Sequence, residues 1–125
     1  MAGDGRRAVA AFERAVELSD GVPGDLSALG HALAVQGRTA EAEAVLARLS
    51  QSSERRYVPP FFFGLAHLSL GRDDEGYRWL DAAAAARDYY LTHLPVDPRL
   101  DPYRGDPRFA RLVALVDGGA GEPTG

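Results

Sequence analysis

The 125-residue chain contains no cysteine, lysine, asparagine or isoleucine. Without cysteine there can be no disulfide and no thiolate metal ligand, so cysteine usage leaves the redox compartment open. Lysine, asparagine and isoleucine use AT-rich codons, and their joint absence favours a GC-rich bacterial genome over deliberate engineering. All 14 basic residues are therefore arginine, against 18 acidic residues, and the net charge of −4 argues against a general nucleic-acid surface.

The sequence also lacks long apolar runs. No stretch approaches the roughly 18 residues of a membrane-spanning helix, and its start lacks the charged-then-apolar order of a signal peptide. We therefore expect a cytoplasmic protein without a membrane partner. Hydrophobic residues make up 46% of the sequence, which is usual for a folded domain, and the length favours one domain.

A glycine-based phrase occurs twice. Gly30 begins Gly-His-Ala-Leu and is followed by Gly37, while Gly64 begins Gly-Leu-Ala-His and is followed by Gly71. Gly30 precedes Gly64 by 34 residues, and Gly37 precedes Gly71 by 34 residues. This period is the length of a helix–turn–helix repeat. The expected unit is a pair of antiparallel helices. Its inner glycine permits close helix approach, and its second glycine ends the first helix with a positive φ.

Apolar spacing sets the expected helices. The first complete pair is expected over residues 23–36 and 39–50, with Ala42 facing Gly30. The same repeat offset places a second pair after the Pro-Pro step at 59–60. An incomplete unit precedes them, because a helix over 6–19 lacks its partner helix. Either the sequence is cut from a longer array, which we favour, or another chain supplies the partner. Residues 1–5 are expected to be a short lead.

Three Asp-Pro steps follow the repeats, at 97–98, 101–102 and 106–107. Each combines an N-cap acceptor with a proline suited to the first helical position, so helix capping is a better interpretation than an acidic site. They predict two short turns and then a helix over about 107–116. The Gly-rich residues 118–125 predict a disordered tail.

The small pairs Gly30/Ala42 and Gly64/Gly76 resemble those of the tetratricopeptide repeat (TPR) family, over about residues 3–88. The Asp-Pro phrase resembles the closing segment of TPR arrays in bacterial regulators and signalling enzymes. The resemblance implies an all-α fold, a short TPR-type α-solenoid of antiparallel helix pairs with a C-terminal capping helix. The expected organisation is a half unit (1–20), two units (21–54 and 55–88), a capping segment and helix (89–117) and the tail (118–125).

The resemblance implies a protein–protein interaction scaffold, not an enzyme. A peptide or helix of a partner protein would bind its concave groove, and the chain would be part of a larger bacterial regulatory protein. A self-association module that forms a homodimer is the first alternative, and a small-molecule sensor domain is the second. The resemblance places these residues in the groove: Ser27, His31, Ala34, Val35, Val58, Phe61, Leu65, Leu68 and Ser69.

The sequence shows no pattern typical of catalysis or of a cofactor site. There is no nucleophile motif and no glycine-rich phosphate loop. The histidines His31, His67 and His93 lack metal-ligand spacing, so no metal and no cofactor are expected. His67 is predicted at the edge of the core. The carboxylate clamp known in the TPR family uses lysine and asparagine, and this chain has neither.

Overall fold

The structure is a computed structural model that describes the backbone of residues 2–121 and the side chains of residues 5–116. This part of the chain is helical and contains no strand, which confirms the all-α class. No helix within it is long and apolar enough to cross a bilayer. The elements in order are α1 (Ala2–Ser19), α2 (Pro23–Val35), α3 (Thr39–Ser52), α4 (Pro60–Ser69), α5 (Asp73–Ala85), the 3-10 helices η1 (Tyr89–His93) and η2 (Pro98–Tyr103), and α6 (Pro107–Gly121).

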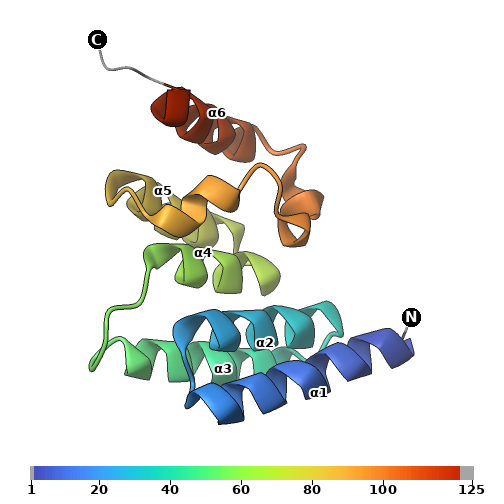
Figure 1. The fold of residues 1–125 in the computed structure, drawn as a ribbon. Coiled ribbons are helices and arrows are strands. Elements are labelled where there is room, and N and C mark those ends of the chain that lie inside the picture. The colour runs from blue at the N-terminus through green and yellow to red at the C-terminus, as the bar shows by residue number, and fades with distance from the viewer. Residues whose placement is uncertain (1, 122–125) are drawn as a thin grey trace.

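The helices pack in sequence order (Figure 1). The pairs α2/α3 and α4/α5 contact each other through α2 and α4, while α1 packs on α2 and α6 packs on α5. Helix α4 is apolar on all sides, and seven of its ten residues are buried. A helix with this pattern belongs in the middle of a fold. The core therefore runs continuously through the stack, with α4 at its centre.

Helices α2 and α4 end in the same way. Gly37 has φ +77° and Gly71 has φ +79°, as the sequence predicts. The N–H of Gly37 donates to the carbonyl of Ala34, and the N–H of Arg38 donates to the carbonyl of Leu33. The same two bonds recur at the equivalent positions of the next repeat, at the end of α4. This is a Schellman motif, in which a left-handed glycine satisfies the last carbonyls of a helix.

The close approach predicted for the inner glycines is present in only one pair. A Cβ at Gly64 would lie 2.7 Å from Leu80 Cδ2 and 3.2 Å from the carbonyl of Gly76. At Gly30 the nearest atom would be Cγ1 of Val45, at an ordinary 3.4 Å. Helices α4 and α5 therefore need glycine at their contact. Helices α2 and α3 do not, and Gly30 faces Val45 and not Ala42.

The predicted ends of the chain differ from the observed ones. Helix α1 begins at Ala2, so residues 2–5 of the expected lead are helical, and Met1 lies outside the described residues. A Cβ at Gly5 would lie 2.7 Å from Nε2 of Gln36, so the first turns of α1 lie against the end of α2. Helix α6 continues past 116 to Gly121, through the first residues of the predicted tail. The rest of that tail, 122–125, lies outside the described residues.

Two of the three Asp-Pro steps act as predicted. Asp97 accepts the backbone N–H of Arg99 at 2.9 Å and begins η2, and Asp106 accepts the N–H of Arg108 at 2.8 Å and begins α6. The step at 101–102 lies inside η2, where Asp101 accepts from the side chain of Arg104. The capping prediction for Asp101 is therefore wrong, because the 3-10 helix that starts at Asp97 continues through it.

Candidate functional site

The residues predicted to line a concave groove do not line one together. Five are buried: Ser27, Val58, Phe61, Leu65 and Leu68. Three are half-buried: His31, Ala34 and Ser69. Val35 is 72% exposed and lies at the end of α2. The groove prediction is wrong for α4. Leu68 packs against Gly76 of α5, and the segment that follows α5 is bonded near both ends of α4.

Residues 88–104, which we call the covering segment, are attached to α4 near both of its ends. At the start of α4, Oδ2 of Asp88 accepts the backbone N–H of Phe61 at 3.0 Å. At the other end, the hydroxyl of Tyr103 donates to the carbonyl of Leu68. Asp88 also accepts the N–H of Tyr90 through its other oxygen. One carboxylate thus caps α4 and η1 together and satisfies donors at both helix starts.

The covering segment contributes its own leucines to the core. Leu94 and Leu100 are fully buried, and Leu91 is 4% exposed. The ring of Tyr90 packs 4.7 Å from that of Phe62. A later segment of the same chain therefore contacts the helix that the repeat pattern predicts to face an external peptide.

Two predicted site residues do meet, across α2 and α4. Nδ1 of His31 lies 3.0 Å from the hydroxyl of Ser69, which donates to the carbonyl of Leu65 at 2.8 Å. The single hydroxyl proton is thereby used, so the Nδ1–H of His31 is the donor to Ser69. Burial lowers the pKa of His31; the charge of Arg99 lowers it further and that of Asp97 opposes this. The pair joins two helices and gives Ser69 no activating base.

His67 lies at the edge of the core, half-buried as predicted. Its Nδ1 is buried and has no hydrogen-bond partner among the described residues. Burial lowers its pKa. Within the described part of the chain, no group of three histidine, aspartate or glutamate side chains is placed to hold a metal ion.

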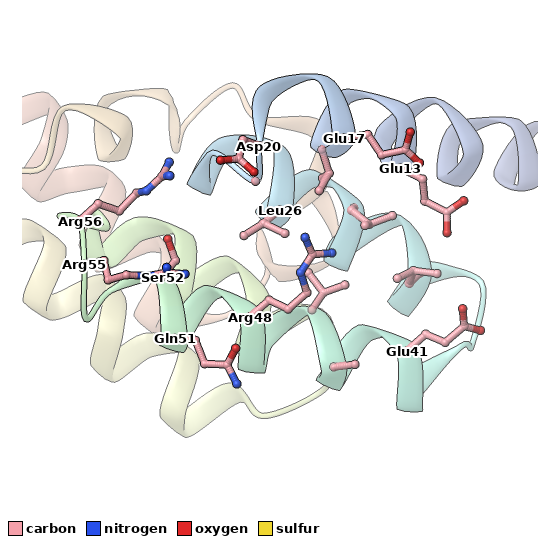
Figure 2. A pocket seen from close by; sticks show the side chains of 16 residues that line it. Glu13, Glu17, Asp20, Leu26, Glu41, Arg48, Gln51, Ser52, Arg55 and Arg56 are labelled. Atoms are coloured by element: carbon pink, nitrogen blue, oxygen red, sulfur yellow. The ribbon is translucent and has the colours of Figure 1, made fainter.

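A hollow lies elsewhere, between α1 and α3 (Figure 2). It has a volume of about 980 Å³, and we call it the α1–α3 cleft. Helix α2 forms its base. The apolar residues that line it are Val16, Leu26, Leu29, Leu33, Ala44 and Val45. All of them except Ala44 are buried, so they form a floor with little exposed surface.

The walls of the α1–α3 cleft carry opposite charges, as Figure 2 shows. One wall is acidic, because Glu13 and Glu17 stand at i and i+4 on α1 and Asp20 follows in the turn after it. The opposite wall is basic and consists of Arg48 in α3 with Arg55 and Arg56 in the turn after it. Glu41, at the start of α3, lines the cleft but is already bound to Arg38.

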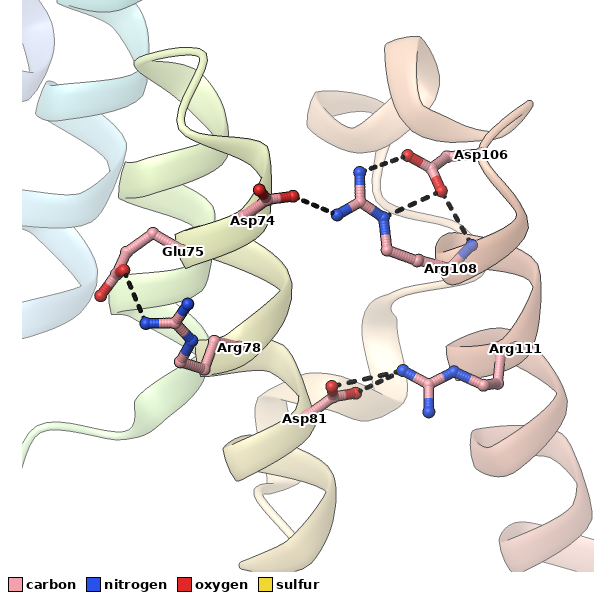
Figure 3. A network of polar contacts seen from close by, with 7 residues as sticks. All are labelled: Asp74, Glu75, Arg78, Asp81, Asp106, Arg108 and Arg111. Atoms are coloured by element: carbon pink, nitrogen blue, oxygen red, sulfur yellow. Dashed lines mark hydrogen bonds and ion pairs between the residues drawn. The ribbon is translucent and has the colours of Figure 1, made fainter.

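The six wall charges, Glu13, Glu17, Asp20, Arg48, Arg55 and Arg56, form no ion pair within 4.0 Å among residues 5–116. Elsewhere in that range seven arginines form eight ion pairs. Figure 3 shows the contrast at the α5–α6 contact, where Arg108 binds Asp74 at 2.8 Å and Arg111 binds Asp81 at 3.0 Å. Arg48 nevertheless reaches toward the acidic wall, since its Nη2 lies 3.8 Å from a Cβ built at Gly21, beside Asp20. The wall charges therefore lack partners among the described residues and are available to a bound group.

Comparison of the chain with protein-family models, with curated proteins and with solved structures gave no match. The site is therefore defined by its own geometry. The sequence analysis missed the cleft, although the acidic residues of α1 stand at helical spacing and three arginines follow at 48, 55 and 56. Those signals identify charged helix faces, but they do not tell how far apart the faces stand.

Proposed function

We propose that this chain is a protein-interaction module of TPR type within a larger bacterial regulatory protein, and that it binds a peptide or helix of a partner in the α1–α3 cleft. The observation that carries the proposal is the pair of oppositely charged walls, unpaired with each other, over an apolar base. The carboxylates and guanidinium groups of the walls can bind side chains of opposite charge by charge-assisted hydrogen bonds. The chemistry that they support is non-covalent binding.

The TPR type is supported by the repeat geometry. Helices α2 and α4 end in identical Schellman motifs, one repeat length apart, and each is followed by an antiparallel partner helix. The proposed binding face is not the concave groove, because the covering segment is bonded to α4 near both of its ends. It is the face on which α1 and α3 flank α2.

Selection from a random-peptide library displayed on phage, with the full chain as bait, tests this function. Selected peptides should shift the backbone NMR signals of cleft residues. Arg48→Glu should abolish binding, whereas Arg14→Glu, which makes the same charge change on α1 outside the cleft, should leave it intact. Peptides that shift signals elsewhere, or a library without enrichment, would refute the function.

Self-association is a second candidate, because the acidic wall and the basic wall complement each other and a second copy carries both. Light scattering with size-exclusion chromatography over a concentration series tests it. A dimer that dissociates on Arg48→Glu would support self-association through the cleft. A monomer at all concentrations would exclude it.

A further inference from the structure

We propose that the occupant of the α1–α3 cleft is an amphipathic helix of a separate protein, with basic residues along one edge and acidic residues along the other. The inference rests on the proposed function and deepens it by stating the chemistry of the partner. It follows from the size of the cleft, the charges on its walls and the packing of the chain's own helices.

The size of the cleft suits a short helical stretch. An α-helix with its side chains is about 10 Å across and rises about 1.5 Å per residue, so the cleft volume of about 980 Å³ holds roughly two turns. The acidic wall extends over the same length, since Glu13 and Asp20 are also roughly two turns apart. Cleft and wall therefore match in length.

The charges of the walls specify the two edges of the occupant. Helices α1 and α3 run in the same direction along the cleft, with Asp20 at the end that carries Arg55 and Arg56 (Figure 2). A helix lying between them meets carboxylates on one side and guanidinium groups on the other. A helix with two basic edges would place one of them against the arginines, and a helix with two acidic edges would place one of them against the carboxylates. Each would meet one wall of its own charge. Only opposite edges satisfy both walls, and like-charge contacts exclude the others.

The base of the cleft specifies the third side of the occupant. Leu26, Leu29 and Leu33 come from one stripe of α2, and Val16 and Val45 extend it toward α1 and α3. These side chains are 2–7% exposed, so they offer the occupant a narrow apolar floor. An apolar stripe with anchors at i, i+3 or i+4 and i+7 is the mode in which helices bind such grooves. The partner helix thus presents apolar residues to α2 between its two charged edges.

The chain itself does not provide this helix within its described part. Helix α6 is held on α5 by Phe109 and Leu112, which are buried, and by the ion pairs of Figure 3. Helix α1 is held on α2 by Val9 and Val16, which are also buried. A second copy could insert one of these helices only by undocking it from its own core. A separate protein requires no such cost.

The test uses three synthetic helical peptides of about 15 residues, a length at which an isolated helix begins to be stable. All share one leucine stripe. The bipolar peptide has lysine on one edge and glutamate on the other, the basic peptide has lysine on both edges, and the acidic peptide has glutamate on both. Calorimetric titration of the full chain should show the bipolar peptide binding at least about tenfold more tightly than the other two.

Variants that change one wall should change the preference. With Arg48→Glu and Arg55→Glu together, Arg56 remains but both walls carry a net negative charge, and the basic peptide should bind most tightly. With Glu13→Arg and Glu17→Arg together, both walls are basic and the acidic peptide should bind most tightly. Because each variant gains binding of one peptide, loss of folding cannot imitate the result. The same ranking in all three proteins, or no binding by natively folded proteins, would overturn the inference.

Failure of the inference can be distinguished from failure of the proposed function. If library-selected peptides bind the cleft but ignore the charge ranking, the partner chemistry is wrong and the function stands. If neither library nor designed peptides bind there, both are wrong. A wild-type dimer that dissociates on Arg48→Glu together with Arg55→Glu would identify a second copy as the occupant and overturn the separate partner.

Discussion

Gly64 and Leu80 lie so close together that a Cβ at position 64 would be 2.7 Å from Cδ2 of Leu80. The equivalent position in the preceding helix pair, Gly30, has no such neighbour. It lies beside a small internal hollow of about 10 Å³ that Ala42 also lines. Two glycines at the same place in the repeat thus have different surroundings, and the same substitution should affect them differently.

Gly64→Ala should lower the free energy of unfolding by about 1–3 kcal/mol, because Leu80 and the backbone of Gly76 must move to admit a methyl group. Gly30→Ala should leave it unchanged or raise it by up to about 1 kcal/mol, because alanine favours the helix and a methyl group fits there. Urea denaturation of both variants measures the difference. Equal losses would show that the two helix pairs pack alike.

Gly37→Ala should destabilise the fold by about 1–2 kcal/mol, because a residue with a Cβ is disfavoured at φ +77°. Gly105→Ala is the matched control. Neither glycine has an atom within 4 Å of a built Cβ, and Gly105 has no left-handed φ. The control should be neutral or gain about 0.4–1 kcal/mol from a less flexible unfolded chain. A loss at both positions in urea denaturation would contradict the explanation by backbone conformation.

Tyr77→Phe should keep or raise stability. Tyr77 is 2% exposed, and its hydroxyl has no hydrogen-bond partner among the described residues. Burial raises its pKa to about 12. The guanidinium of Arg108, 4.4 Å from the ring centre, can pack on phenylalanine equally well.

The matched control for this change is Tyr103→Phe, which removes a hydroxyl that donates to the carbonyl of Leu68. It should cost about 0.5–1.5 kcal/mol, the net contribution of one hydrogen bond. Thermal and urea denaturation of the two variants compare a buried hydroxyl without a partner with one that has a partner. A clear loss for Tyr77→Phe would reveal a partner for that hydroxyl.

Leu100→Ala should cost about 2–5 kcal/mol, because Leu100 is fully buried in the covering segment and its truncation leaves a cavity. Val96→Ala, in the same segment but 74% exposed, should change stability by less than about 0.5 kcal/mol. Urea denaturation checks both. A small effect of Leu100→Ala would mean that the covering segment is not part of the core in solution.

Stability should fall as the pH drops from 7.5 to 5.5. Burial lowers the pKa values of His31 and His67 below the usual value near 6.5. The unfolded chain therefore takes up protons first as the pH falls through 6.5, and the folded state loses stability relative to it. Their contribution is fully present above pH 6.5 and is lost below it. Urea denaturation at several pH values between these limits measures the slope.

His67→Leu separates the two histidines. Leucine stands at the equivalent position of the preceding repeat, Leu33, which is buried. Because Nδ1 of His67 has no partner among the described residues, the variant should be at least as stable at pH 7.5. It should also show a smaller loss between pH 7.5 and 5.5, with the remainder due to His31. If the variant lost as much stability between pH 7.5 and 5.5 as the unchanged protein, His67 would not contribute to the pH dependence.

Several features of this fold follow from local sequence. The left-handed turns at Gly37 and Gly71 were predictable because a helix end depends on a few consecutive residues. The caps at Asp97 and Asp106 follow from the Asp-Pro pairs for the same reason. The step at Asp101 shows the limit of such signals, since the same dipeptide lies inside the 3-10 helix that Asp97 caps.

The candidate site was not predictable in this way. The repeat phase predicts that Leu65 and Leu68 face a groove, but Leu68 packs against α5, where a Cβ at Gly76 would lie 2.6 Å from Cγ of Leu68. Other residues that contact α4 are far along the chain, as with Tyr103, which bonds to a carbonyl 35 residues earlier. Repeat spacing carries no information about a segment that follows the repeats and folds back.

By itself, the sequence determined the all-helical class, the approximate helix limits and the two glycine turns, because apolar spacing, glycine and Asp-Pro act over a few residues. Only the tertiary structure decided which surface is open. It attached residues 88–104 to α4, and it left Glu17 and Arg48 lining one cleft without pairing. Both outcomes depend on packing between segments distant in sequence, where the distance between helices, and not their composition, decides what remains exposed.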